Sequence, residues 1–186
     1  MRNLLRTGLI FLLFSLVAGT AQAQVCKPES IPASTPDSQL QDNGDGTVTD
    51  LKTGLMWKQC AEGQSGSGCA EDTANDTATE YPMWQNALLR AQEVNTGGGF
   101  AGFTDWRVPN IKELASLVEH QCTGPAINLT RFPNTPSSYF GSSSIQAGRS
   151  AYFWTVSPYG LVMGGSTNVT HPLLSKAWLR LVRSAP

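Results

Sequence analysis

Apolar and polar side chains repeat with two different periods along residues 97–121, and each period predicts its own element. After Pro109, apolar side chains recur at helical spacing and form one face of a predicted helix: Ile111, Leu114, Ala115, Leu117 and Val118. Asn110 stands where the N-cap of this helix belongs, and Glu113 follows three residues later, as in a capping box. Before the helix, residues 103–106 alternate with period two, which predicts a short half-buried strand.

The same patterns recur elsewhere in the chain. A second helix is predicted to begin at Pro82, a favoured first helical position, and to end at Asn95 and Gly97. Its inward face carries the apolar residues Trp84, Ala87, Leu88, Ala91 and Val94. Runs of strand-favouring residues predict strands at 47–49, 55–57, 152–156 and 177–183. Two helices and several short antiparallel strands, with long loops on one side, indicate an α+β domain.

The sequence Asn-Gly-Asp-Gly at residues 43–46 is a tight-turn signal that also resembles part of a calcium-binding loop. Aligning Asp45 and Gly46 with positions five and six of an EF-hand loop puts Gln41 at position one and Lys52 at position twelve. An EF-hand needs Asp and a bidentate Glu at those two positions. The spacing therefore favours a hairpin turn.

Residues 1–23 have the features of a signal peptide. Arg2 and Arg6 precede an apolar run at 9–18, and an Ala-Gln-Ala cleavage signal ends at Ala23. The apolar run is shorter than the roughly 20 residues that a membrane-spanning helix needs. Removing these 23 residues from the 186 leaves 163, which we predict to form an extended arm at 24–40 and one domain at 41–186, with no membrane span.

Four cysteines in an exported chain are expected to form disulfides. Cys60 and Cys69 are separated by a flexible Gly- and Ser-rich loop that closes easily, so we predict that they pair. Cys26 would then pair with Cys122 and fasten the N-terminal arm to the end of the central helix. There is no C-x-x-C motif, and His120 has no neighbouring ligand set, so we predict no metal and no cofactor.

The charges are divided unequally along the chain. All 14 acidic residues lie at or before Glu119, whereas only basic residues follow it: Arg131, Arg149, Lys176, Arg180 and Arg183. One interpretation is a basic face that binds an anionic polymer. The other, which we favour, is that the two halves of the chain neutralise each other on folding.

No arrangement of residues indicates catalysis or nucleic-acid binding. The chain has two histidines, His120 and His171, no G-x-S-x-G nucleophile motif, and no nucleic-acid-binding motif. Arg107 and Glu113 lie on either side of Pro109, one helical turn apart, and we predict that they form an ion pair that stabilises the turn. We interpret four residues here as structural: Trp106, Arg107, Asn110 and Glu113.

Four segments resemble one bacterial family, the Lcl C-terminal domain family: 42–57, 102–114, 126–135 and 179–183. The resemblance implies a C-type lectin-like fold, with two helices, a twisted antiparallel sheet and long loops at one end. The family takes its name from a surface adhesin that binds sulfated polysaccharide, which implies an extracytoplasmic binding role. Gly141 stands where the family usually has tryptophan, and residues 160–176 also depart from the family pattern.

We therefore expect an exported, non-catalytic binding or adhesion domain, secreted or periplasmic, with attachment to the cell surface as a further option. Long loops at 124–150 and 157–172 would recognise an anionic polysaccharide or an envelope protein. Aromatic and basic side chains in or near these loops are the candidate ligand-binding residues: Tyr139, Arg149, Tyr159 and Lys176.

Two alternatives belong to other functional classes. The first is a structural subunit of an envelope or appendage assembly, in which the same loops contact other subunits. The second is an enzyme, because residues 107–114 resemble the R-L-P-T-x-x-E-W run of the formylglycine-generating enzymes. Oxidation chemistry of that kind needs reactive thiols, and we predict that all four cysteines are in structural bridges.

Overall fold

A computed structural model describes residues 23–72, 84–163 and 177–186. The predicted signal peptide lies outside these residues except for Ala23. Among these residues, antiparallel strands form four small sheets, and two α-helices and one short 3-10 helix accompany them, so the predicted α+β class is confirmed. None of the helices in the described ranges is long and apolar enough to cross a membrane.

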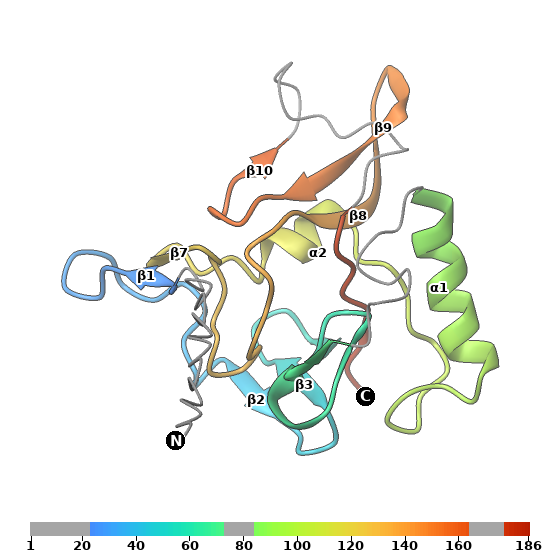
Figure 1. The fold of residues 1–186 in the computed structure, drawn as a ribbon, viewed down its shortest axis with the longest axis horizontal. Helices are drawn as coiled ribbons and strands as arrows, with labels where there is room; N and C mark the ends of the chain where they lie inside the picture. Colours follow the sequence, from blue (N-terminus) through green and yellow to red (C-terminus); the bar gives the residue numbers. More distant parts are fainter. Residues whose placement is uncertain (1–22, 73–83, 164–176) are drawn as a thin grey trace, which may run out of the picture.

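A four-stranded sheet occupies one end of the molecule (Figure 1). Its order is β11 (Val182–Ser184), β4 (Leu55–Lys58), β3 (Thr47–Asp50) and β2 (Leu40–Asp42). Asp42 pairs with Val48, so the turn at 43–46 closes a hairpin, as predicted. The strands predicted at 47–49 and 55–57 are confirmed.

A three-stranded sheet occupies the opposite end of the molecule in Figure 1, in the order β10 (Val162–Met163), β9 (Arg149–Val156) and β8 (Phe140–Gln146). The strand predicted at 152–156 is thus confirmed within β9. A Cβ atom on Gly141 would lie 3.0 Å from Cε2 of Phe153. The Phe153 ring therefore occupies the space beside Gly141.

Each of the two smallest sheets is associated with one disulfide. β1 (Val25–Cys26) pairs with β7 (Cys122–Thr123), and β5 (Gln64–Ser65) pairs with β6 (Glu71–Asp72). The short 3-10 helix η1 (Ser67–Cys69) lies between β5 and β6. Cys26 is bonded to Cys122 and Cys60 to Cys69, so both predicted pairings are confirmed.

Helix α1 (Trp84–Thr96) ends where the sequence predicted, but its inward face differs. Ala91 is buried, and Ala87 and Val94 pack against the core. Leu88 is 36% exposed, so its predicted inward position is wrong. Pro82 and the Trp84 side chain lie outside what the structure describes.

Helix α2 (Ile111–Ala115) is shorter than predicted, although its start is as predicted. The Asn110 side chain accepts from the Lys112 and Glu113 amides, and the Glu113 carboxylate accepts from the Asn110 amide, which completes the capping box. Beyond Ala115, the amides of residues 117 and 118 donate to carbonyls only three residues earlier. The chain tightens into a turn there, and it still buries the apolar side chains at both positions.

The strand predicted at 103–106 is wrong. The amides and carbonyls of Phe100 and Phe103 bond each other across a tight turn, and the Asn95 side chain bonds both the amide and the carbonyl of Trp106. Because a side-chain amide satisfies this backbone, no strand partner is needed. Thr104 and Asp105 are both exposed, so the expected alternation is absent.

The core consists of two apolar clusters, and the C-terminal segment contributes to both. Leu179 and Leu181 belong to the cluster that contains Trp106, whereas Val182 belongs to the cluster that contains Trp57. In Figure 1 this segment, in red, runs from the β8–β9–β10 end toward the four-stranded sheet. The strand predicted at 177–183 is confirmed only at its end, in β11.

Candidate binding site

The loop predicted at 124–150 is shorter than expected, because residues 140–146 form β8 and β9 begins at Arg149. Its first residues lie beside the second predicted loop at one end of the β8–β9 ladder. The amides of Gly124 and Ala126 both donate to the carbonyl of Pro158, at 3.2 and 2.9 Å. The hydroxyl of Ser157 accepts from the Tyr159 and Leu161 amides and organises the second loop. Residues 124–127 and 157–161 therefore lie side by side, and residues 135–138 line the same cavity. We call these three segments together the loop surface.

Gly160 allows the second loop to approach the turn that follows α2. Its φ is +75°, and a Cβ atom there would lie 2.7 Å from Cγ1 of Val118 and 3.0 Å from Cβ of Ala126. Both the backbone conformation and the close approach require glycine.

A half-enclosed cavity of about 40 Å³ lies beneath the loop surface. Apolar side chains from α2 and the following turn form part of its wall: Leu114, Leu117 and Val118. Pro125, Pro136 and Pro158 line it from the loops. Its polar lining comes from Thr135, Ser138, Ser157 and Arg180.

Arg180 is the charged residue of this lining, and it is 1% exposed. Its Nη1 donates to the carbonyls of Lys58, at 2.9 Å, and Gln59, and its Nη2 donates to Oγ1 of Thr135 at 2.8 Å. The guanidinium carbon lies 4.8 Å from the ring centroid of Phe132 and 5.8 Å from that of Phe140. Burial lowers the pKa of Arg180 to about 9, against the opposing effect of a nearby carboxylate, so the group is charged at neutral pH.

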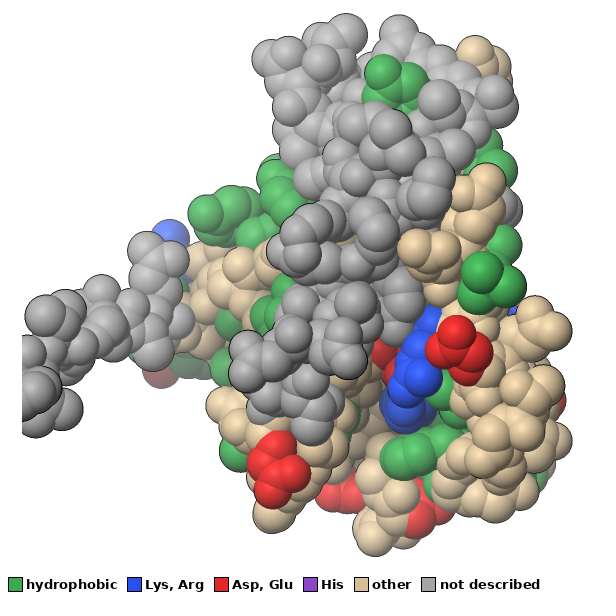
Figure 2. Space-filling view, turned by 45° about the vertical axis from the view of Figure 1, so that its right-hand side comes forward, with side chains coloured by type: hydrophobic (Ala, Val, Ile, Leu, Met, Phe, Trp, Pro, Cys, Tyr) green, Lys and Arg blue, Asp and Glu red, His purple; other side chains and the backbone are tan. Residues whose placement is uncertain are grey.

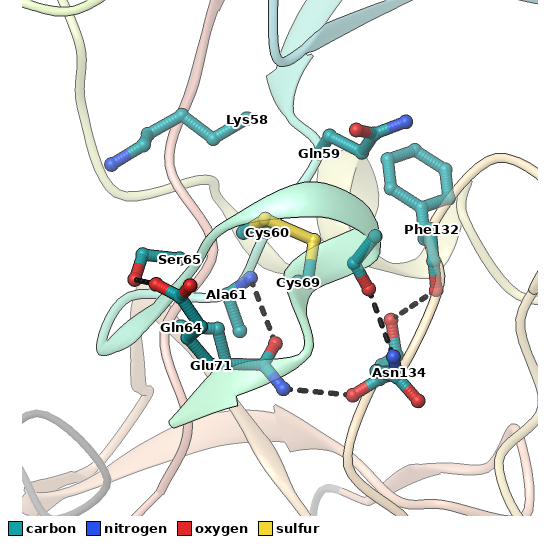
Figure 3. Close-up of a disulfide and its surroundings, with 12 residues drawn as sticks. Lys58, Gln59, Cys60, Ala61, Gln64, Ser65, Cys69, Glu71, Phe132 and Asn134 are labelled. Atoms are coloured by element: carbon teal, nitrogen blue, oxygen red, sulfur yellow. Dashed lines mark hydrogen bonds between the residues drawn. A yellow bond between two sulfur atoms is a disulfide. The ribbon is translucent and has the colours of Figure 1, made fainter. Parts of the chain in front are cut away.

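The Cys60–Cys69 loop lies beside Phe132 and Asn134 (Figure 3). The Gln64 side chain accepts from the Ala61 amide and donates to the carbonyl of Asn134, and the Asn134 side chain donates to the carbonyl of Gly68. The next residue, Thr135, donates to Phe132 and accepts from Arg180. The small disulfide loop is therefore linked by hydrogen bonds to the residues that hold the buried guanidinium.

The predicted ligand-binding residues do not form a single cluster. Phe140 pairs with Val156, which places Tyr139 and Tyr159 toward the loop-surface end of the β8–β9 ladder. Arg149 pairs with Gln146 at the other end, about 20 Å away for a strand of this length. Tyr139 is half-buried and Tyr159 is 66% exposed. The Arg149 side chain and the whole of Lys176 lie outside what the structure describes.

Late basic residues face early acidic ones, as the favoured charge interpretation predicts. Arg183 lies 2.7 Å from Asp105, and Arg131 lies 3.9 Å from Asp37. The hydrogen bond from Arg183 lowers the pKa of the Asp105 carboxyl. Among the described side chains on the face shown in Figure 2, a short stretch of basic side chains lies beside acidic ones.

A second, larger cavity of about 350 Å³ lies between the N-terminal arm and residues 127–130. Its lining includes Asp37, Glu119 and the Cys26–Cys122 bridge. The Glu119 carboxylate accepts from the amides and hydroxyls of Ser34 and Thr35 and from the Gln121 amide. Burial acts to raise the pKa of Glu119, but these hydrogen bonds outweigh it and hold the pKa below its ordinary value. This acidic lining opposes the binding of anions.

The predicted Arg107–Glu113 ion pair is confirmed, with two contacts of 2.7 Å. The hydrogen bonds from Arg107 are the main cause of the lowered pKa of Glu113. Because the same carboxylate closes the capping box, the pair fixes the start of α2 and plays a structural part.

All four cysteines are in disulfides, so none is available as a thiol. Within residues 23–72, 84–163 and 177–186, no group of three His, Cys, Asp or Glu side chains could hold a metal ion. The sequence did not single out Arg180 as a site residue. The Leu-Arg-Leu run gave no signal of such a role, because alternation with two buried leucines predicts that the Arg180 side chain is exposed.

Residues 46–183 match the family described as the Lcl C-terminal domain. No curated protein and no solved structure matches the chain.

Proposed function

The chain belongs to the Lcl C-terminal domain family, and on that premise we propose that it is an exported, non-catalytic binding domain. Its ligand is a polysaccharide or a protein, and it binds through the loop surface. We further propose that the α+β arrangement is of the C-type lectin-like kind, as the family resemblance implies. The two disulfides support export, because such bonds form and persist in oxidising compartments.

One observation carries this proposal: hydrogen bonds join the two loops beside a cavity, and the buried guanidinium of Arg180 forms part of the cavity wall. Loops held by a rigid scaffold are common sites of recognition, and a concave, mainly apolar site with a few polar groups is the usual form of a ligand pocket. Tyr159 adds an exposed ring at the edge of this surface, suited to stacking on a sugar or packing on a protein.

A polysaccharide array that carries neutral, uronic and sulfated polymers tests the proposal. We expect the purified protein to retain a subset of the polymers, and we expect Tyr159→Ala to weaken retention about fivefold, as the loss of one aromatic contact of about 1 kcal/mol implies. Leu51→Ala is the matched control, because Leu51 is 59% exposed in the turn between β3 and β4, away from the loop surface. Equal losses in both variants, or no retention by the parent together with no co-purifying envelope protein, would contradict the proposal.

A structural role in an envelope or appendage assembly is the second candidate. The observation in its favour is the exposure of large apolar side chains in and after the β8–β9 hairpin: Ile145, Tyr159 and Leu161. Such a subunit would self-associate or co-purify with other envelope proteins. Size-exclusion chromatography with light scattering decides between the candidates, since an assembly subunit would show a mass that rises with concentration.

A further inference from the structure

Arg180 is a buried cation whose hydrogen-bonding capacity is only partly used. A guanidinium carries five N–H donors. Among the described residues, its hydrogen bonds to the carbonyls of Lys58 and Gln59 and to Thr135 account for three of these donors. The Nε–H and one Nη2–H have no acceptor there. These donors belong to a residue that lines the cavity beneath the loop surface.

No carboxylate among the described residues forms a salt bridge with this guanidinium. The acidic group that influences it is Glu62, which is itself buried. Glu62 is already paired with Lys58, at 2.5 Å, and with Arg90, at 2.9 Å. Arg90 is 37% exposed and also contacts Glu93, at 3.4 Å, whereas Arg180 is buried and has no contacting carboxylate among the described residues. Buried charges are normally balanced by a contacting counter-charge, so the site beside Arg180 favours an anion.

The cavity has the size and lining for a small anionic group. At about 40 Å³ it has room for roughly three water-sized groups, which is close to the volume of one carboxylate. Thr135 and Arg180 provide polar atoms, while Leu114, Leu117 and Val118 provide an apolar wall. A carboxylate could bond the unused guanidinium donors while an adjoining methyl or methylene group packs on the apolar wall.

We propose that the cavity beside Arg180 is a binding site for the carboxylate of a ligand, with Arg180 as its charged partner and the α2 side chains as its apolar wall. The inference deepens the proposed binding role of the loop surface and names the group that it recognises. Two kinds of ligand could supply this carboxylate: a free short-chain carboxylic acid, or an acidic sugar of a polysaccharide. The experiments below distinguish between them.

The test is a nuclear magnetic resonance titration of the whole purified protein with sodium acetate at constant ionic strength, with sodium chloride as the reference salt. We expect saturable shifts of the amides of residues 126, 135 and 138, with a dissociation constant on the order of 1–10 mM. Chloride should give smaller shifts. Shifts that rise linearly with acetate, or equal shifts with both salts, would overturn the proposal.

Two variants identify the group responsible. Arg180→Met is expected to weaken acetate binding at least tenfold, whereas Lys52→Gln, which removes one cation from an exposed turn, should change it less than twofold. Because Arg180→Met removes buried hydrogen bonds and its folding must be checked, Ala126→Leu provides an independent test. It fills the cavity and keeps the guanidinium, and we expect it to abolish the saturable shifts. Unchanged binding in Ala126→Leu would rule out this cavity.

Competition by a polyuronate separates the two sources of carboxylate. Displacement of acetate by the polyuronate, but not by the same polymer with its carboxyl groups reduced, would identify an acidic sugar and support both proposals. Saturable acetate binding without retention of any polymer or protein would uphold the carboxylate site and contradict the proposed function. Polymer binding that Arg180→Met and Ala126→Leu leave unchanged would uphold the proposed function and overturn the carboxylate site.

Discussion

At the scale of single residues, Gly160 shows how one position places the binding loop. Gly160 and Gly44 have the same φ of +75°, but a Cβ atom meets nothing within 4 Å at Gly44 and lies 2.7 Å from Val118 at Gly160. The two glycines therefore separate the cost of the backbone conformation from the cost of the close approach.

We predict that Gly44→Ala costs about 1 kcal/mol of stability, from the left-handed conformation alone, and that Gly160→Ala costs about 2–4 kcal/mol because Val118 must also move. Urea denaturation of both variants measures the difference. Equal costs would show that the loop can move away from Val118, and that it does not hold the cavity in its present shape.

Glu119 is the residue that holds the N-terminal arm by hydrogen bonds. Replacing it by Gln puts an amide donor against the donors of Ser34 and Thr35, so we predict that Glu119→Gln loses about 2 kcal/mol at neutral pH. Glu29→Gln, at an exposed position on the same arm, should be neutral and serves as the control.

The pH dependence of stability follows from the direction of the Glu119 pKa shift. The folded pKa lies below the ordinary value of 4.5, so the carboxylate stabilises the fold above about pH 4.5 and loses this effect as the pH falls through the folded pKa. We predict that the parent is destabilised by acid more steeply than Glu119→Gln. Parallel curves from denaturant titrations between pH 7 and 3 would show that Glu119 is not the group responsible.

The residues predicted best from sequence are those whose partners lie close in the chain. Asn110, Arg107 and Glu113 were identified because a capping box and a one-turn ion pair are local patterns. Arg180 was not identified, because its contacts at Lys58, Gln59 and Thr135 are 45 to 122 residues away. Alternation along residues 179–182 predicts that the Arg180 side chain is exposed. In the structure, however, this segment lies between two apolar clusters, which cover it on both sides.

At the scale of elements, each disulfide stabilises a different part of the molecule. Cys26–Cys122 closes a separation of 96 residues and holds the arm, whereas Cys60–Cys69 closes a separation of 9 and supports residues 131–135. In the loop-entropy description, removal costs about 5 kcal/mol for the long loop and about 3 kcal/mol for the short one.

We predict that Cys60→Ala/Cys69→Ala increases hydrogen exchange at residues 131–135 and leaves the arm protected. Cys26→Ala/Cys122→Ala should do the reverse and increase exchange at residues 24–35. Each double variant is the control for the other, and mass spectrometry of peptides from both segments makes the comparison. The same exchange pattern in both variants would show that the two bridges act only on global stability.

The elements predicted from sequence were correct in type more often than in length. β3, β4 and β9 were predicted because strand-favouring runs are flanked by clear turn signals. α2 was predicted too long, because Leu117 and Val118 bury the same face from a tightened turn as they would from a helix. The spacing of apolar residues predicts which side of the segment is buried. It does not distinguish an α-helix, whose amides bond carbonyls four residues earlier, from a tighter turn, whose amides bond carbonyls three residues earlier.

At the scale of the whole molecule, the sequence predicted the α+β class and the pairing of the cysteines, but it did not predict how the strands group into sheets. In the described residues the strands divide among four sheets, and the C-terminal segment contributes to both core clusters. The β8–β9–β10 sheet lies at one end of the molecule, with residues 157–161 between β9 and β10, and the four-stranded sheet lies at the other end (Figure 1). The account therefore predicts that ligand contacts concentrate at one end of the molecule.

Hydrogen exchange of the purified protein, with and without the polysaccharide or protein partner that it retains most strongly, tests this prediction most directly. Exchange should slow in residues 124–127, 135–138 and 157–161 and remain unchanged in residues 40–52, which form β2, β3 and the start of the following turn. Protection confined to residues 40–52, or to the arm at 24–37 beside the larger cavity, would contradict the assignment of the loop surface as the site of binding.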